Sequence, residues 1–251
     1  MFDPTTPTTL YAATHYGGVY KSEDGGTWQH MGRFRALDPE LAIAPTTPTT
    51  LYLYGGGGVY KSADGGETWR AVNRGLELGE TKWVHALSID PTNPRVVFAG
   101  TGNGVYKSTD GGESWRRVTW SASALSIDLT NPRVVFAGIG NSVYKSTDGG
   151  ETWTETWTST GRNEVWDMLI DPQNPQVIVA RTEEGVLRSV DGGATWHAAD
   201  GLPAESVQSL LLGPAGVMYA NFWKDCAHLY RSADGGATWS RIDIIAARVS
   251  A

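Results

Sequence analysis

Short apolar runs alternate with glycine- and proline-rich turns along the whole chain of 251 residues. In residues 84–118, the runs VHALSID, RVVFAGT, VYKS and ESWRRV are separated by PTNP, GNG and TDGG. Apolar runs of about four to eight residues, rich in β-branched and aromatic side chains and bounded by turn residues, are typical of strands. No segment keeps a helical period over about ten residues. The pattern predicts an all-β chain built from units of four short antiparallel strands.

The four-strand unit recurs six times. Each copy contains a variant of the string Ser-x-Asp-Gly-Gly-x-Ser/Thr-Trp, with its aspartate at Asp24, Asp64, Asp110, Asp148, Asp191 or Asp234. Successive aspartates are 40, 46, 38, 43 and 43 residues apart, a period that is typical of one blade of a β-propeller. We therefore expect residues 1–251 to form a single six-bladed β-propeller around a central channel.

The two ends of the chain predict how the ring closes. The string FDPTTPTTLYAA aligns with IDPTNPRVVFAG of the third unit, so we expect the first unit to lack its innermost strand. After the last aspartate string, RIDIIAARVSA carries one strand more than a sixth blade requires. We expect this surplus strand, residues 245–250, to complete blade 1 and remove an exposed sheet edge.

The recurrent string itself is predicted to be structural. In KSTDGGESW the two glycines permit positive φ, and Asp110 can accept hydrogen bonds from backbone N–H groups of the turn. Trp115 can cover this turn and fill the space towards the next blade. The string is no phosphate-binding loop, because the lysine and the helix of such loops are missing. A motif with this self-sufficient role in every unit favours scaffolding over catalysis.

The string resembles the Asp-box, or BNR repeat, of sialidases, xyloglucan-cleaving glycoside hydrolases, sortilin-type receptor domains and a photosystem II assembly factor. The resemblance covers all six units, although the first box, SEDGGTW, is one residue shorter. It implies that the box is a structural turn on the outer part of the blade, away from the ligand face. Relatives of this kind are largely extracytoplasmic and functionally mixed, so the resemblance implies the fold and leaves activity open.

Composition excludes several functional classes. A net charge of -7 and the absence of a Lys/Arg run argue against nucleic-acid binding. No apolar stretch approaches about 18 residues, so we expect no membrane span. The first residues contain no basic and apolar leader, which leaves the compartment undecided. Cys226 is the single cysteine, and the histidines have no metal-ligand spacing, so we expect no internal disulfide and no metal site. We also expect no cofactor, and a monomeric protein.

Candidate binding residues gather on one predicted face. Because blade strands alternate in direction, the DPTNP and DGG turns share one face, and the varied connections share the other, where binding usually occurs. Tryptophans flanked by polar groups suit a glycan, a peptide or a protein partner. The candidates are Trp83, His85, Trp120, Arg162, Glu164, Trp166, Trp223, Asp225 and His228.

We expect a non-catalytic scaffold that binds a protein, peptide or glycan through these loops. The alternative is a glycoside hydrolase or sugar-binding module, with its carboxylate pair drawn from Glu164, Asp167, Glu183, Glu184 and Asp225. No spacing selects two of them, and the strand arginines that a sialidase would have are absent from the innermost strands. An enzyme should place two carboxylates at an open channel mouth, whereas a scaffold should have a flat or plugged one. A third interpretation is a module without a ligand, with its tryptophans buried between blades.

Overall fold

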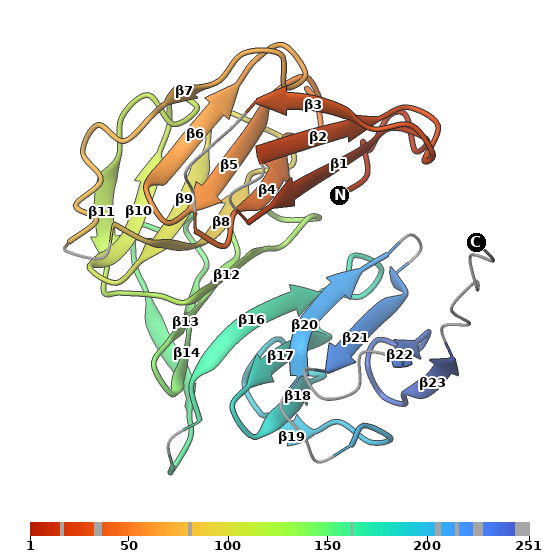
Figure 1. Ribbon diagram of the computed structural model, residues 1–251. Coiled ribbons are helices and arrows are strands. Elements are labelled where there is room, and N and C mark those ends of the chain that lie inside the picture. The colour runs from red at the N-terminus through yellow and green to blue at the C-terminus, as the bar shows by residue number, and fades with distance from the viewer. Residues whose placement is uncertain are drawn as a thin grey trace.

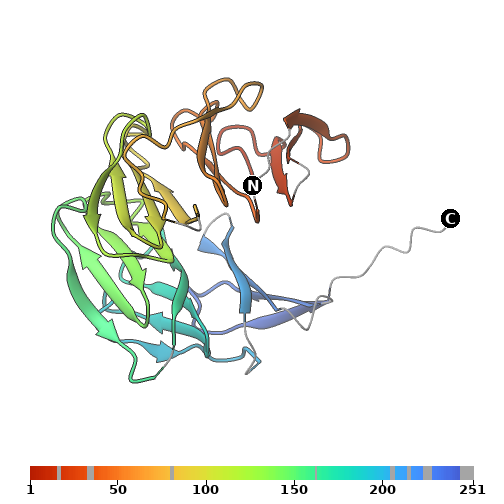
Figure 2. The same cartoon turned by 60° about the vertical axis from the view of Figure 1, so that its left-hand side comes forward.

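The computed structural model describes residues 1–15, 18–32, 37–79, 82–161, 163–203, 207–213, 216–222 and 228–243. Over these residues the chain is all-β, and six antiparallel sheets surround a central channel as the blades of a propeller (Figures 1 and 2). The predicted fold class, an all-β six-bladed propeller, is confirmed. The second strands of blades 2 and 3 are buried at every position, on both faces, because each of these blades packs between two neighbouring blades.

Within each blade the strands pair in chain order from the innermost to the outermost. Blade 1 comprises β1 (Leu10–Thr14), β2 (Gly18–Ser22) and β3 (Gln29–Gly32); blade 2, β4 (Glu40–Ile43), β5 (Leu51–Gly55), β6 (Gly58–Ser62) and β7 (Arg70–Ala71); blade 3, β8 (Val84–Ile89), β9 (Val97–Thr101), β10 (Gly104–Ser108) and β11 (Arg116–Thr119); blade 4, β12 (Ala124–Ile127), β13 (Val135–Ile139), β14 (Ser142–Ser146) and β15 (Thr154–Thr158); blade 5, β16 (Val165–Ile170), β17 (Ile178–Thr182), β18 (Gly185–Ser189) and β19 (His197–Ala198); blade 6, β20 (Val207–Leu212), β21 (Met218–Phe222), β22 (His228–Ser232) and β23 (Ser240–Asp243).

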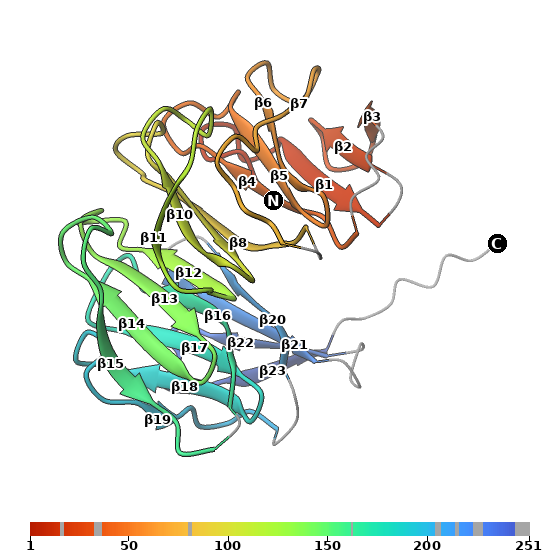
Figure 3. The same ribbon diagram turned by 90° about the vertical axis from the view of Figure 1, so that its left-hand side faces the viewer.

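The innermost strands gather around the channel while β11, β15 and β19 lie at the rim (Figure 3). The buried core lies between adjacent blades. Between blades 2 and 3, for example, Trp115 packs with Tyr52 and Val97, and its indole Nε1 donates to the carbonyl of Val72 at 2.8 Å. Each such interface buries a large aromatic surface, which is the main source of stability for a sheet that is too small to fold alone.

Blade 1 differs from the other five, which have four strands each. Its described sheet has three named strands, and residues 1–3 pair with the inner edge of β1 through a bridge between Phe2 and Leu10. The segment predicted to complete this blade, residues 245–250, lies outside the described residues. The shorter first box also forms a different turn, because the Ser22 hydroxyl accepts from Gly25 at 3.0 Å, whereas the other boxes use the second glycine.

Each of those longer boxes is a closed network of hydrogen bonds. In blade 4 the buried Ser146 hydroxyl donates to Asp148 Oδ1 at 2.8 Å and accepts the N–H of Gly150 at 2.8 Å. Asp148 in turn accepts the N–H of Thr152 at 2.9 Å and its hydroxyl at 2.6 Å. Gly150 has φ 84°, in the left-handed region that favours glycine. The two box side chains therefore satisfy the polar groups of the turn that they form.

The box also joins neighbouring blades. In four of the interfaces the carbonyl of the first box glycine accepts a hydrogen bond from a side chain of the preceding blade. These bonds are Tyr11 to Gly65 (3.2 Å), Tyr52 and Lys61 to Gly111 (2.9 and 2.7 Å), Lys145 to Gly192 (2.9 Å) and Arg188 to Gly235 (2.7 Å). Between blades 3 and 4, Lys107 pairs instead with Glu151 at 2.7 Å.

Ser146→Ala should destabilise the protein by about 1 to 3 kcal/mol, because it leaves the buried N–H of Gly150 without an acceptor. The free energy of unfolding, measured by urea titration followed through tryptophan fluorescence, checks this value. Thr160→Ala is the matched control for loss of a hydroxyl, since Thr160 is exposed and its replacement should change stability by less than about 0.5 kcal/mol. Equal effects of the two substitutions would contradict the role given to the box serine.

Acid should also weaken the boxes. Hydrogen bonds from Thr68 and Ser114 to the carboxylates lower the pKa of Asp64 and Asp110 to about 2, below the value of about 3.9 for an unfolded chain. A depressed folded-state pKa stabilises the fold above about pH 4, and that stabilisation is lost as the pH falls towards 2. Asp110→Asn should therefore lose less stability than the wild type between pH 5 and 3 in urea titrations. Parallel losses would count against this assignment.

Candidate functional site

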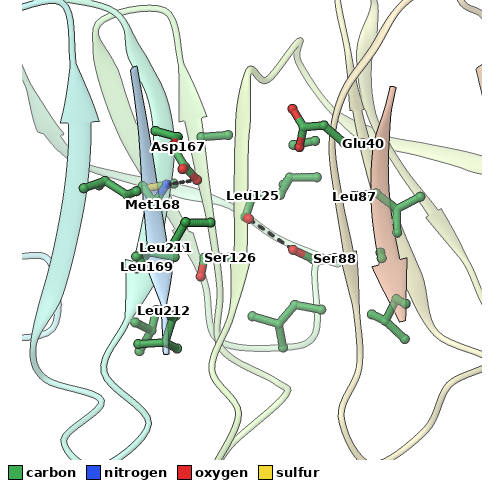
Figure 4. Close-up of a pocket in the computed structure, with 18 of the residues that line it drawn as sticks. Glu40, Leu87, Ser88, Leu125, Ser126, Asp167, Met168, Leu169, Leu211 and Leu212 are labelled. Atoms are coloured by element: carbon green, nitrogen blue, oxygen red, sulfur yellow. Dashed lines mark hydrogen bonds between the residues drawn. The ribbon is translucent and has the colours of Figure 1, made fainter. Parts of the chain in front are cut away.

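A cavity of about 800 Å³ follows the propeller axis between the innermost strands (Figure 4). Its wall comes from β4, β8, β12, β16 and β20, whose amino-terminal ends meet at the mouth beside the varied connections. We call this end the polar mouth, and define it by Glu40, Tyr54, His85, Trp166, Asp167, Arg181 and Gln208. Towards the other end, Leu169, Leu211 and Leu212 line an apolar wall (Figure 4).

One register position of the blades supplies most of the polar groups at this mouth. At this position, a residue near the start of the innermost strand pairs with the fourth residue of the second strand. Blades 3 and 4 have small residues there, Ala86 with Gly100 and Ala124 with Gly138. Blades 2, 5 and 6 instead carry Glu40 with Tyr54, Asp167 with Arg181 and Ser209 with Asn221. Three blades thus replace a small pair by a polar one at the same height in the channel.

A β-bulge adds a further side chain to three blades. The pairing of the innermost and second strands shifts between Val84 and Ala86, between Val165 and Asp167, and between Val207 and Ser209. The extra residues are His85, Trp166 and Gln208, and all three line the cavity. Bulges redirect side chains and are frequent beside binding sites. Equivalent bulges therefore place an imidazole, an indole and an amide around one mouth.

The two carboxylates of the polar mouth lie in different surroundings. Burial raises the pKa of Asp167 to about 6, although the charge of Arg181 opposes the rise, and Glu40 adds to it. Asp167 accepts the backbone N–H of Met168 at 2.8 Å, and Glu40 accepts the Tyr54 hydroxyl at 2.7 Å. Burial also raises the pKa of Tyr54 well above its usual value. The Tyr54 phenol therefore stays neutral at pH 7 beside the carboxyl groups of Glu40 and Asp167.

Arg181 supplies the balancing charge without direct ion pairing. Its guanidinium lies over the Trp166 ring, 5.2 Å from the centroid, and Nη1 donates to the carbonyl of Val207 at 3.4 Å. Its Nε is buried and has no hydrogen-bond partner among the described residues. Within the described part of the chain, no salt bridge joins Arg181 to Glu40 or Asp167. Arg181 therefore acts on Asp167 through a longer-range electrostatic interaction and not through a direct ion pair.

Comparison with known proteins agrees with this architecture. A family model described as BNR/Asp-box repeat matches residues 144–155, which contain the fourth box. This segment is thus similar to an Asp-box repeat, and the chain folds as a β-propeller. No curated protein matches its sequence. No described helix could cross a membrane, and the described residues contain no group of His, Cys, Asp and Glu suited to a metal ion.

Several solved propellers resemble this chain in structure. The GH74 xyloglucanase from Xanthomonas campestris has a TM-score of 0.78 at 17% identity, over 96% of this chain and 44% of the enzyme. YCF48 from Cyanidioschyzon merolae has a TM-score of 0.66 at 19% identity, over 96% of this chain and 83% of that one. YCF48 bound to D1 peptide has a TM-score of 0.64 at 16% identity, over 94% of this chain and 78% of that one. The propeller thus spans less than half of the GH74 enzyme, and these likenesses show the fold alone.

The structure brings only some of the predicted binding residues together. Trp83 stacks on His85 with ring centroids 6.4 Å apart, and Trp166 Nε1 donates to Glu164 at 3.3 Å. Trp120 is 66% exposed but lies beyond the outermost strand of blade 3, and does not line the cavity. His228 begins β22, and only its backbone is described. Arg162, Trp223 and Asp225 lie outside the described residues.

Part of this site was not predicted from the sequence. Tyr54 and Arg181 lie on second strands, whereas the predicted binding residues lie at the varied connections. A signal was present, because alignment of the units puts Tyr54, Arg181 and Asn221 where units three and four have Gly100 and Gly138. Their orientation towards the channel depends on strand pairing, which a linear pattern does not specify.

The raised pKa of Asp167 predicts how Asp167→Asn changes stability with pH. Because the folded-state pKa lies above the unfolded value, Asp167 destabilises the fold progressively as the pH rises from about 4 to 6. The stability of the variant relative to the wild type should increase over that range by on the order of 1 kcal/mol. Urea titrations at pH 4, 5, 6 and 7 measure the difference. A constant difference would show that Asp167 titrates normally.

Proposed function

We propose that this propeller is a non-catalytic recognition module that binds an extended segment of a partner protein at the polar mouth. The observation that carries the proposal is that three bulge residues and five of the six residues of three polar register pairs line one end of a cavity. That cavity, about 800 Å³, is within the usual size of ligand sites. The box turns at the other end of the blades are almost the same in every unit, whereas the residues at the polar mouth differ from blade to blade.

A peptide suits the shape and chemistry of the mouth. Trp83, His85 and Trp166 supply flat ring surfaces at its rim, and aromatic side chains dominate the energetics of protein recognition. Glu40 and Gln208 supply hydrogen-bonding groups beside those rings. A propeller of similar fold, YCF48, is known with D1 peptide bound, which supports a peptide ligand for this architecture. The deeper apolar wall can accept a protruding side chain.

Selection of random twelve-residue peptides displayed on phage tests the proposal with the full chain as bait. We expect enriched peptides to bind saturably in solution, with a change in tryptophan fluorescence. Trp166→Ala should weaken their binding at least tenfold, because it removes ring surface at the mouth. Trp120→Ala is the matched control and should leave affinity unchanged, since that exposed ring lies away from the cavity. Failure to enrich binders, or equal effects of both variants, would contradict the proposal.

A second candidate is a glycan-binding or glycan-cleaving site. It is supported by Glu40 and Asp167, which face the same cavity, with the pKa of Asp167 raised to about 6 as a general acid requires. Incubation with xyloglucan oligosaccharides and analysis of the products tests it. Cleavage that is abolished by Asp167→Asn would favour the enzyme, whereas unchanged oligosaccharides that do not bind would remove this candidate.

A further inference from the structure

The polar mouth has more negative than positive charge. Among the described residues that line the cavity near this end, Glu40 and Asp167 are acidic and Arg181 is the cation. Desolvation lowers the pKa of His85, so its imidazole is neutral at pH 7. The rise in the pKa of Asp167 has the same origin, since burial outweighs the attraction of Arg181. A further positive charge would therefore be stabilised here.

The contacts within the mouth leave room for that charge. Tyr54 donates to Glu40, and the backbone N–H groups of Met168 and Leu210 donate to Asp167, although a carboxylate can accept about four hydrogen bonds. The guanidinium of Arg181 is held over Trp166 and contacts neither carboxylate directly. Glu40 and Asp167 come from blades 2 and 5, and Figure 4 shows them on two sides of the cavity. A cation between them would therefore donate further hydrogen bonds to both carboxylates.

The walls around the carboxylates suit a cation on a flexible apolar stem. Trp166 and His85 flank the entrance, where methylene groups can pack against ring surfaces. Beyond the carboxylates, Leu169, Leu211 and Leu212 are apolar, and the hydroxyls of Ser88 and Ser126 are neutral (Figure 4), so a charged head should stop at Glu40 and Asp167. An anionic side chain would be repelled, and a neutral one would leave the charges uncompensated.

We propose that the polar mouth takes a lysine or arginine side chain of the bound peptide, with its cationic head between Glu40 and Asp167. This inference rests on the proposed function and adds the chemical class of the anchoring residue. Binding should weaken as salt increases, because the contact is electrostatic. It should also weaken below about pH 6, where Asp167 becomes protonated.

The selected peptides provide the first test. We expect each family to carry one basic residue whose replacement by norleucine, for lysine, or citrulline, for arginine, weakens binding at least tenfold. Glu40→Gln and Asp167→Asn should each cause a similar loss, and little more when combined with the neutral peptide, since both changes remove the same contact. Glu67→Gln, an exposed carboxylate in the second box, is the matched control. Thermal unfolding monitors whether each variant is folded.

A second measurement does not depend on the selection. Titration of the full chain with Nα-acetyl-arginine amide should give a saturable fluorescence change that Nα-acetyl-citrulline amide does not give, and Asp167→Asn should abolish it. Equal behaviour of the two compounds would overturn the inference, as would selected peptides that lack a basic anchor. Peptides that bind through Trp166 but are insensitive to Glu40→Gln and Asp167→Asn would overturn the cation site and leave the recognition module standing.

Discussion

The hydrogen bond between the box serine and the box aspartate is the contact on which the rest of the propeller depends. With a net value of about 0.5 to 1.5 kcal/mol each, such bonds are modest, but they fix the backbone of a turn whose glycine carbonyl faces the preceding blade. Lysine, tyrosine and arginine side chains bond to that carbonyl, as Lys145 does to Gly192. The box therefore shapes one blade and attaches it to its neighbour.

The separation of the box from the polar mouth explains how a candidate site can arise on a repetitive fold. The box lies at one end of the blade and the polar mouth at the other, so substitutions at the mouth leave the attachments between blades intact. Where blades 3 and 4 keep a glycine, packing is tight, since a Cβ on Gly100 would lie 2.7 Å from the Ala122 carbonyl oxygen, and one on Gly138 would lie 2.7 Å from Val165. The polar side chains accordingly occur in blades 2, 5 and 6.

Aspartates of this chain differ in how their surroundings treat the charged form. Box aspartates are stabilised as anions by several donors, and their pKa values fall, whereas burial raises the pKa of Asp167. Local departures from the most stable arrangement are typical of functional sites. The contrast between aspartates of one chain thus separates structural carboxylates from those available to a ligand.

The sequence by itself determined the six units, the all-β class and the separation of a uniform from a varied face, because strand period, turn residues and box spacing are local properties. It also selected Trp83, His85 and Trp166, but with the same evidence it selected Trp120, which lies at the outside of blade 3. Only the tertiary structure decided that Glu40 shares a cavity with Asp167 and that Arg181 faces them. The physical reason is that the stacking of blades around the channel and the β-bulges, neither of which has a local signature, decide which side chains meet.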